Sequence, residues 1–198
     1  MNPGDCLQRY FLDYQRTWIL DEHRAKLCEK ARRVGWTYAS SFRRVWRALA
    51  VPRLDAWWMT RDLVTAHEFI RYCRFWCELV SALAEGLDGD RLAAADPVSG
   101  VRTQMIEFRN GSRIQVLSSN PDAAAGKGGD LGLDEFALHQ QQERLYQVAR
   151  PVVMWGYQLE IISTHRGAET VFNRLVQQAR GPNPMGWKHY RVTIQDAV

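Results

Sequence analysis

The sequence predicts an α/β fold in which helices connect the strands of a sheet. Short strand-like runs alternate along the chain with longer segments of helical periodicity, and neither an internal repeat nor a long linker interrupts them. The 198 residues are 46% hydrophobic and 24% charged, which is ordinary for a globular domain and excludes a disordered or collagen-like chain. No run approaches the roughly 18 uncharged apolar residues that a membrane-spanning helix needs. One domain over residues 1–198 is therefore expected.

The first half of the chain predicts two strands, each followed by a helix. A short strand over residues 27–31 precedes a helix over residues 36–50, and a strand over residues 55–60 precedes a long helix over residues 63–84. The apolar residues of the first helix are spaced to share one face: Phe42, Val45, Trp46 and Leu49. In the long helix, apolar residues recur at three- and four-residue steps, which predicts one buried face.

The second half predicts a β-hairpin and then an alternation of strands and helices. Asn110-Gly111, between two alternating runs over residues 105–109 and 112–117, is the strongest hairpin signal in the chain. The remaining elements follow in order: a strand at 131–133, a helix at 140–148 that stops before Pro151, a strand at 159–162, a helix at 169–179 and a strand at 190–194.

The positive charge is concentrated in one segment. The whole chain carries a net charge of +4, but residues 24–53 hold nine basic residues against a single acidic one, Glu29. The nine are Arg24, Lys26, Lys30, Arg32, Arg33, Arg43, Arg44, Arg47 and Arg53. This concentration indicates where a phosphate-rich partner would bind. A solvated basic helix face is the alternative interpretation.

A loop that resembles a phosphate-binding loop lies between the first strand and the first helix. Residues 30–37 read KARRVGWT, whereas the usual pattern is G-x-x-x-x-G-K-[ST]. Gly35 and Thr37 match the second glycine and the hydroxyl that binds Mg²⁺. Trp36 occupies the usual lysine position, and Lys30 stands at the usual first glycine. A flexible lysine at the start of the loop could still reach the phosphates. The alternative is a surface turn before a basic helix.

Polar residues end two of the predicted strands. Asp134-Glu135 closes an apolar run, and two adjacent carboxylates could hold the Mg²⁺ shell and polarise an attacking water. A solvated acidic turn is the alternative. Ser163-Thr164-His165 ends another strand and could sense a γ-phosphate, the alternative being a helix N-cap.

Together, these motifs resemble those of the ATPase domain of tailed-bacteriophage terminase large subunits, in particular the Mu-like phage and prophage terminases. Tyr14-Gln15 resembles their Q motif, residues 30–37 their deviant Walker A, residues 131–137 their Walker B, and residues 163–165 their coupling motif. The order and spacing agree from about residue 8 to residue 198. The resemblance implies a RecA-like P-loop NTPase core, with a central, mostly parallel sheet flanked by helices and an added β-hairpin.

The resemblance also implies roles for individual residues. Tyr14 and Gln15 would lie on the adenine side. Thr37 and Asp134 would bind Mg²⁺, and Glu135 would be the catalytic carboxylate. Nucleotide would be bound by five further residues of the loop: Lys30, Ala31, Val34, Gly35 and Trp36. Arg32 or Arg33 would steady the charge of the transition state. Ser163 and Thr164 would couple hydrolysis to movement.

The implied function is that of a motor that hydrolyses ATP with Mg²⁺ and drives double-stranded DNA into a capsid. The implied partners are the portal protein, the small terminase subunit and other copies in a ring, in the host cytoplasm at the procapsid portal. A degenerate domain that binds nucleotide or DNA without turnover is the alternative. A helicase-type translocase would need a second RecA-like domain, for which 198 residues leave no room.

Three departures from the family pattern bear on activity. Ala31 replaces a frequent serine, and Ala125 stands where an arginine is common, so Lys127 would have to substitute for it. The family's nuclease domain is absent, so we expect no DNA cleavage from these residues and interpret the chain as an ATPase domain, a fragment or the product of a truncated gene.

Two other groups of polar residues are interpreted as structural. Cys73, Cys77 and His67 offer too few converging ligands for a metal site, which favours core packing. The four cysteines, without a secretory signal, predict reduced thiols. His139 could position a water, but a cap of the next helix is the favoured interpretation.

Overall fold

The computed structural model describes residues 3–85 and 105–197. The chain forms two compact units and passes between them several times. The first unit comprises the described parts of Met1–Asp21, Gly35–Ala56 and Ala66–Gln115. The second comprises the described parts of Glu22–Val34, Trp57–Thr65 and Val116–Val198.

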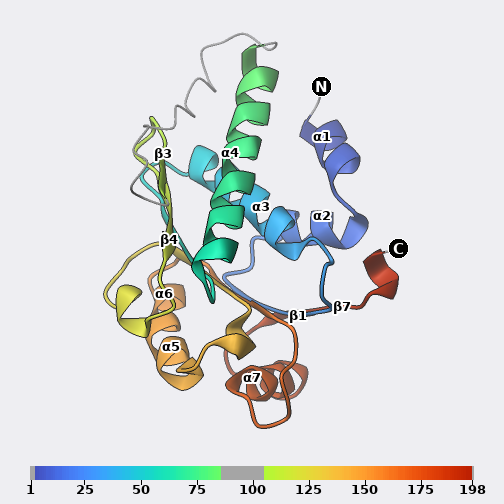
Figure 1. The fold of residues 1–198 in the computed structure, drawn as a ribbon, viewed down its shortest axis with the longest axis vertical. Helices are drawn as coiled ribbons and strands as arrows, with labels where there is room; N and C mark the ends of the chain where they lie inside the picture. The colour runs from blue at the N-terminus through green and yellow to red at the C-terminus, as the bar shows by residue number, and fades with distance from the viewer. Residues whose placement is uncertain (1–2, 86–104, 198) are drawn as a thin grey trace. The chain divides into compact units, whose positions relative to one another are not determined.

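The first unit is built on helices that share an aromatic core. Its helices are α1 (Pro3–Tyr10), α2 (Asp13–Leu20), α3 (Trp36–Ala50) and most of α4 (Leu63–Glu85). Phe11 lies 5.0 Å from Phe42 of α3 and 5.1 Å from Trp76 of α4, measured between ring centroids. Trp76 also donates its indole N–H to the hydroxyl of Ser41 at 3.0 Å. These contacts place α4 alongside α3, as Figure 1 shows.

The predicted hairpin lies at the end of this unit. Strands β3 (Met105–Glu107) and β4 (Arg113–Leu117) pair antiparallel around the turn. Gly111 adopts a φ of 83° and donates its N–H to the carbonyl of Phe108 at 2.9 Å. This left-handed conformation is the reason that glycine suits the turn. The Asn110-Gly111 prediction is confirmed.

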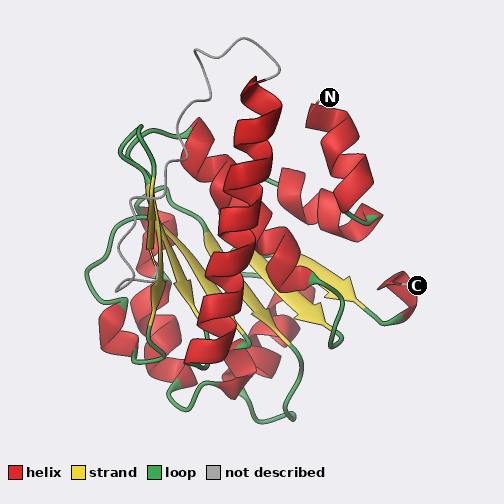
Figure 2. Ribbon diagram, turned by 45° about the horizontal axis from the view of Figure 1, so that its top comes forward, coloured by secondary structure: helices red, strands yellow, loops and turns green. Residues whose placement is uncertain are grey.

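The second unit is a parallel sheet with helices packed on it. Its strands are β1 (Ala25–Lys30), β5 (Asp130–Asp134), β6 (Leu159–Ser163) and β7 (Lys188–Val192), with the end of β2 (Asp55–Met59). Its helices are α5 (Gln142–Ala149), α6 (Pro151–Met154) and α7 (Val171–Arg180). Over the described strands the order is β3-β4-β2-β5-β6-β1-β7. Figure 2 shows the strands as neighbouring yellow arrows, and the prediction of a mostly parallel α/β fold is confirmed.

The core of the second unit forms where one face of this sheet meets the helices. Leu27, Leu133 and Ile161 share one row across β1, β5 and β6 and are fully buried. Phe172 and Leu175 of α7 pack on the same cluster. Every residue of β5 and β6 is buried, as expected for parallel strands covered on both faces.

The interior holds several side chains for which the sequence predicted other positions. Arg43 and Arg44 are fully buried in α3, whereas Trp46, predicted on the apolar face, is 44% exposed. Arg43 donates to the carbonyl of Ile19 in α2. Three of the nine basic residues of the segment over residues 24–53, Lys26, Arg43 and Arg44, therefore lie inside the protein and are not available at its surface to a partner.

Smaller differences concern the ends of the chain and the cysteines. The last strand lies two residues earlier than predicted, at Lys188–Val192, and helices α1 and α2 were not predicted. Cys73 and Cys77 are buried free thiols, and the pKa of Cys77 is raised by burial to about 12. His67 lies exposed on the same helix, so the core-packing interpretation of the two cysteines is confirmed.

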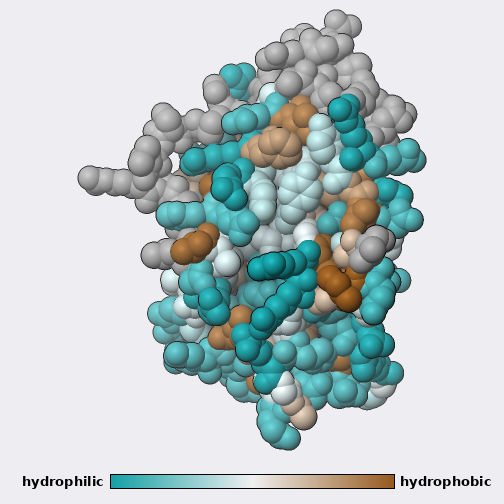
Figure 3. Space-filling view, turned by 45° about the vertical axis from the view of Figure 1, so that its right-hand side comes forward, coloured by the Kyte–Doolittle hydropathy of each residue, from teal (hydrophilic) through white to brown (hydrophobic). Residues whose placement is uncertain are grey.

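Exposed apolar side chains are scattered. The face in Figure 3 carries small brown areas separated by teal. The large exposed apolar residues among those described are Leu12, Leu20, Trp46, Val51, Val64, Phe75, Met154, Trp155 and Ile194. No helix in the described ranges combines the length and apolar character needed to cross a membrane.

Candidate functional site

Three predicted site residues meet at the carboxyl ends of three neighbouring strands of the second unit. Lys30 ends β1, Glu135 follows β5 and Thr164 follows β6. The ammonium of Lys30 lies 2.6 Å from Glu135 Oε1, and Thr164 donates its hydroxyl and its backbone N–H to Glu135 Oε2 at 3.3 and 3.4 Å. Ligand sites of parallel α/β sheets lie at this edge.

The backbone aims the Glu135 carboxylate at this meeting point. Glu135 adopts φ 49° and ψ 44°, a left-handed conformation that is uncommon for a residue with a side chain. Its N–H is held by the carboxylate of Asp134 at 3.0 Å, and its carbonyl accepts the N–H of Leu138 at 2.8 Å. The sharp turn lets two consecutive acidic residues present their carboxylates at the same place.

The surroundings of Glu135 favour its ionised form. Burial alone would raise its pKa, but the charge of Lys30 and the hydrogen bonds from Lys30 and Thr164 outweigh burial. The net result is that the pKa of Glu135 is lowered from its ordinary value. A carboxylate that stays ionised can accept a proton or orient a water.

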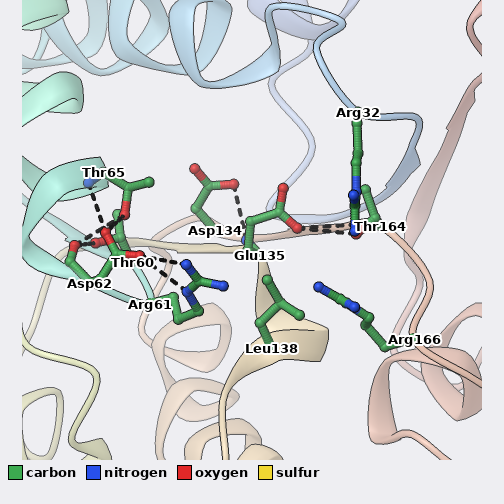
Figure 4. A pocket seen from close by; sticks show the side chains of 10 residues that line it. All are labelled: Arg32, Thr60, Arg61, Asp62, Thr65, Asp134, Glu135, Leu138, Thr164 and Arg166. Atoms are coloured by element: carbon green, nitrogen blue, oxygen red, sulfur yellow. Dashed lines mark hydrogen bonds and ion pairs between the residues drawn. The ribbon is translucent and has the colours of Figure 1, made fainter.

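A cavity of about 140 Å³ opens beside these residues (Figure 4). Its lining places two carboxylates, Asp134 and Glu135, among three guanidinium groups, those of Arg32, Arg61 and Arg166. Arg61 pairs with Asp62 at 2.9 Å. Within the described ranges, the side chains of Arg32 and Arg166 are exposed and carry no hydrogen bond or ion pair.

This set of donors and acceptors fits a magnesium–nucleotide pair. Guanidinium groups and an ammonium bind phosphate oxygens. Mg²⁺ is usually held by one or two carboxylates together with phosphate oxygens and water, and the Asp134 carboxylate lines the cavity with only 3% of the residue exposed. Clusters of three or more metal-ligating side chains are absent from the described residues.

The start of the predicted phosphate loop is fixed to the edge strand. Ala31 donates its N–H to the carbonyl of Val192 in β7 at 2.8 Å, so this amide is already used within the protein. Arg33 has a φ of 60°. It is exposed, as is Arg32, whereas Val34 is buried. Of the two arginines, only Arg32 lines the cavity.

The other half of the loop lies in the first unit, where Gln15 supports it. The Gln15 side chain donates to the carbonyl of Gly35 at 3.2 Å and accepts the N–H of Leu12 at 3.0 Å. Gly35 has a φ of 65°, and a Cβ there would come within 2.7 Å of Gln15 Nε2. Gly35 therefore meets two requirements, a left-handed backbone and close approach by Gln15.

Trp36, at the usual lysine position, is a core residue. It is 2% exposed and packs between Tyr14, stacked at 5.7 Å, and Trp18, at 5.0 Å between ring centroids. Tyr14 and Gln15 thus both contact the loop inside the first unit. Thr37, in the first turn of α3, belongs to this unit and Asp134 to the second. Their shared magnesium site stays a prediction.

The ends of β5 and β6 are joined by Ser163. Its hydroxyl accepts the N–H of Ala137 at 3.0 Å and donates to the carbonyl of Thr164 at 2.9 Å. His139 is buried, with Nε2 3.2 Å from the carbonyl of Asp134, and burial lowers its pKa. The interpretation of His139 as a cap of the next helix is wrong, because Gln141 is the residue that precedes α5, whereas its role in positioning a water stays a prediction.

Lys127, the proposed substitute for a missing arginine, is held in the loop before β5. Its ammonium lies 4.4 Å from the centroid of the Trp57 ring. Trp57 in turn donates its indole N–H to the carbonyl of Gly128 at 2.8 Å. A role for Lys127 in hydrolysis, and the consequence of Ala125, stay predictions.

Sequence reasoning missed Arg61 and Arg166, as well as Arg180 and His189 beside Glu29. Arg61 follows β2 and Arg166 follows β6, so both lie just past strand ends. A search for charged residues just past each predicted parallel strand would have found these two arginines.

Comparison with solved structures defines the class of fold. The ATPase domain of the Thermus phage P74-26 large terminase superposes with a TM-score of 0.68 at 19% identity, covering 95% of this chain and 83% of that one. The large terminase of another thermophilic bacteriophage, in complex with ADP, gives 0.67 at 15% identity, covering 94% and 46%. The chain thus has the RecA-like fold of terminase ATPase domains.

Comparison of sequences identifies the relatives. The probable terminase large subunit gp28 of Escherichia phage Mu is 34% identical over 193 residues, 95% of this chain and 35% of that protein. The Mu-like prophage FluMu protein gp28 of Haemophilus influenzae is 32% identical over 192 residues, 94% and 37%. No family model matches. The chain spans about a third of these proteins, and the resemblance to Mu-like terminase large subunits is confirmed.

Proposed function

We propose that the chain is an ATP-hydrolysing motor domain of a phage DNA-packaging terminase. The observation that carries the proposal is the junction of Lys30, Glu135 and Thr164 at the ends of β1, β5 and β6. A cation, an ionised carboxylate and a hydroxyl, beside a cavity lined by arginines, are the groups that phosphoryl transfer requires.

Each of these groups has a distinct task in the proposal. Lys30 exchanges the Glu135 carboxylate for phosphate oxygens when nucleotide binds, which leaves Glu135 to orient a water. Arg32 lies at the cavity and stabilises charge on the transferred group. Asp134 holds Mg²⁺, which neutralises phosphate charge when bound, and resemblance gives Thr37 the same task. Thr164 and Ser163 link Glu135 to the end of β6.

The wider assignment is supported by the relatives. Their names include a terminase large subunit, and one structural neighbour was solved with ADP. Double-stranded DNA, the portal protein, the small subunit, a ring of copies and a place in the host cytoplasm follow from this resemblance. Arg24, Arg33 and Arg53 are exposed cations of the basic segment, outside the cavity lining, that could bind DNA.

Phosphate release from ATP with Mg²⁺, with and without double-stranded DNA, tests the proposal. We expect turnover in the wild type and none in Lys30→Ala or Glu135→Ala, while Glu135→Ala still binds ATP. Arg174→Ala, which breaks a surface ion pair with Glu143 on α5, is the matched control and should turn over ATP normally. Undiminished turnover in both site variants would contradict the proposal.

A nucleotide-binding domain without turnover is the second candidate. It is favoured by Ala125 and by the position of Lys127, whose charge lies over Trp57. In that case ATP would raise the melting temperature, Lys30→Ala would abolish the rise, and no phosphate would be released under any condition.

A further inference from the structure

A second polar junction surrounds Glu29, the residue before Lys30. Its side chain is 6% exposed, and basic side chains from three different parts of the chain contact its carboxylate. Arg180, the last residue of α7, donates to Oε1. His189 of β7 lies 3.0 Å from the same oxygen, and His165, just after β6, lies 2.8 Å from Oε2. Glu29 therefore joins three elements that are distant in sequence.

The cluster lies next to the candidate catalytic groups along both strands. Successive side chains of a strand point to opposite faces, so Lys30 and Glu29 leave β1 on different sides. Lys30 meets Glu135, which Thr164 contacts, and Glu29 meets the next residue, His165. Two consecutive residues of β1 are thus connected to two consecutive residues after β6.

The strengths of these contacts differ. The hydrogen bonds from Thr164 to Glu135 measure 3.3 and 3.4 Å, at or beyond the long end of the ordinary range. The contact between His165 and Glu29 measures 2.8 Å and involves a carboxylate, which makes it the stronger kind. The His165 ring also packs on Phe172 of α7, at 5.3 Å between ring centroids. His165 is held on two sides, whereas the two donors of Thr164 reach Glu135 only through long bonds.

We propose that Glu29 and His165 form a positioning pair that sets Thr164 against Glu135. The inference rests on the proposed ATPase function and assigns two further residues to it. His165 does not touch the reacting groups; it fixes the segment that does. Arg180 completes the arrangement, because it holds Glu29 in place from α7, with His189 of β7 beside the same oxygen.

The same geometry makes His165 a suitable residue to change. Without His165, the Glu29 carboxylate keeps the positive charge of Arg180 on Oε1, so His165→Ala leaves no buried carboxylate without a counter-charge. The variant should therefore fold, and its defects should be confined to the segment after β6. His165→Gln keeps an N–H that can reach Glu29 and serves as the conservative variant.

Amide hydrogen exchange and steady-state ATP kinetics, measured on the same variants, test the proposal. In His165→Ala we expect exchange of the Thr164 amide to speed up at least about tenfold, and kcat to fall about tenfold to a hundredfold, with KM for ATP changed less than about threefold. His165→Gln should restore most of the protection of the Thr164 amide and most of kcat. Glu143→Gln, which breaks the surface pair with Arg174, is the matched control and should change neither.

The outcomes separate this inference from the proposed function. Unchanged exchange in His165→Ala overturns the positioning role, and so does faster exchange with an unchanged kcat. A rise in KM without a fall in kcat also overturns it, because that result would make His165 a residue for binding. An inactive wild type contradicts the ATPase proposal itself, and the positioning role in catalysis falls with it.

Discussion

Two lysines of β1 have the same chemistry and different surroundings. Lys26 and Lys30 lie four residues apart, so their side chains share one face of the strand. Lys26 lies 3.0 Å from Glu160 Oε1, and both side chains are fully buried. Lys30 lies 2.6 Å from Glu135 Oε1, with side-chain exposures of 7% and 27%.

The difference comes from the position of each partner. Glu160 lies inside β6, directly opposite Lys26 in the parallel register, so its ion pair is enclosed by the sheet. Glu135 lies past the end of β5, in a left-handed turn beside a cavity. An enclosed pair can only contribute to folding, whereas a pair at the open edge can exchange its partner for a ligand. The contrast teaches that burial along the strand, and not residue type, separates an enclosed lysine from one that a ligand can reach.

Changing the enclosed lysine should have the largest effect. Lys26→Met leaves Glu160 buried with its ion-pair partner removed, and loss of one partner of a buried pair costs about 3–5 kcal/mol. We expect this fall in the free energy of unfolding, measured by chemical denaturation. Lys26→Met combined with Glu160→Met should recover much of it. A loss below about 1 kcal/mol in the single variant would contradict the contrast between Lys26 and Lys30, because it would be no larger than the loss expected for an exposed pair.

Changing Lys30 in the same way should have a small effect on stability and a large effect on turnover. Because the Glu135 side chain stays partly exposed, Lys30→Met should cost about 1 kcal/mol or less of unfolding free energy. Loss of one preorganised charge beside the reacting phosphates should lower kcat/KM for ATP by about a hundredfold to a thousandfold. Denaturation and phosphate release on the same preparation measure both. A large loss of stability with normal turnover would mean that Lys30 stabilises the fold and has no role in turnover.

The contribution of Glu29 to stability should lie between those of Lys26 and Lys30, and it should depend on pH. Burial alone would raise its pKa, but hydrogen bonds from His165 and Arg180 and the charges of Arg180 and His189 lower it overall from the ordinary 4.5. A lowered pKa means that its contribution to stability is complete above about pH 4.5 and is lost as the pH falls through the folded-state value.

Glu29→Gln should therefore destabilise the protein at neutral pH by about 1.5–3 kcal/mol, the worth of hydrogen bonds to a charged group. The difference from the wild type should shrink as the pH falls below about 4. Thermal unfolding of both proteins across that range measures this. A difference that stays constant with pH would mean that the Glu29 charge contributes nothing to folding.

A third lysine gives the smallest expected effect. Lys127 contacts the Trp57 ring, whereas Lys26 and Lys30 contact carboxylates. Lys127→Met should lower the free energy of unfolding by about 0.5–1 kcal/mol, the worth of a partly exposed cation–π contact. Chemical denaturation measures this free energy, and Lys26→Met, Lys30→Met and Lys127→Met form a series of matched substitutions. A loss as large as that of Lys26→Met would contradict the ranking by burial.

From β1 onward, the sequence alone determined most of the order of elements and the residues at strand ends. The helix over residues 36–50, the Asn110-Gly111 hairpin and the strands ending at Asp134 and Ser163 follow from local periodicity and turn chemistry. Because side chains at the carboxyl ends of parallel strands converge, Lys30, Glu135 and Thr164 could be named together in advance. Gly35 and Thr37 also marked the loop before α3, whose role in binding phosphate stays a prediction.

Only the tertiary structure decided which charges pair and which are buried. Lys30 and Glu135 are 105 residues apart, Glu29 and His165 are 136 apart, and Glu29 and Arg180 are 151 apart. Such pairs are set by strand register and helix packing, which no local pattern encodes. The same holds for Arg43 inside the first unit and for Trp36 within its aromatic core. A side chain's burial depends on what packs over it, and that is fixed only when distant segments meet.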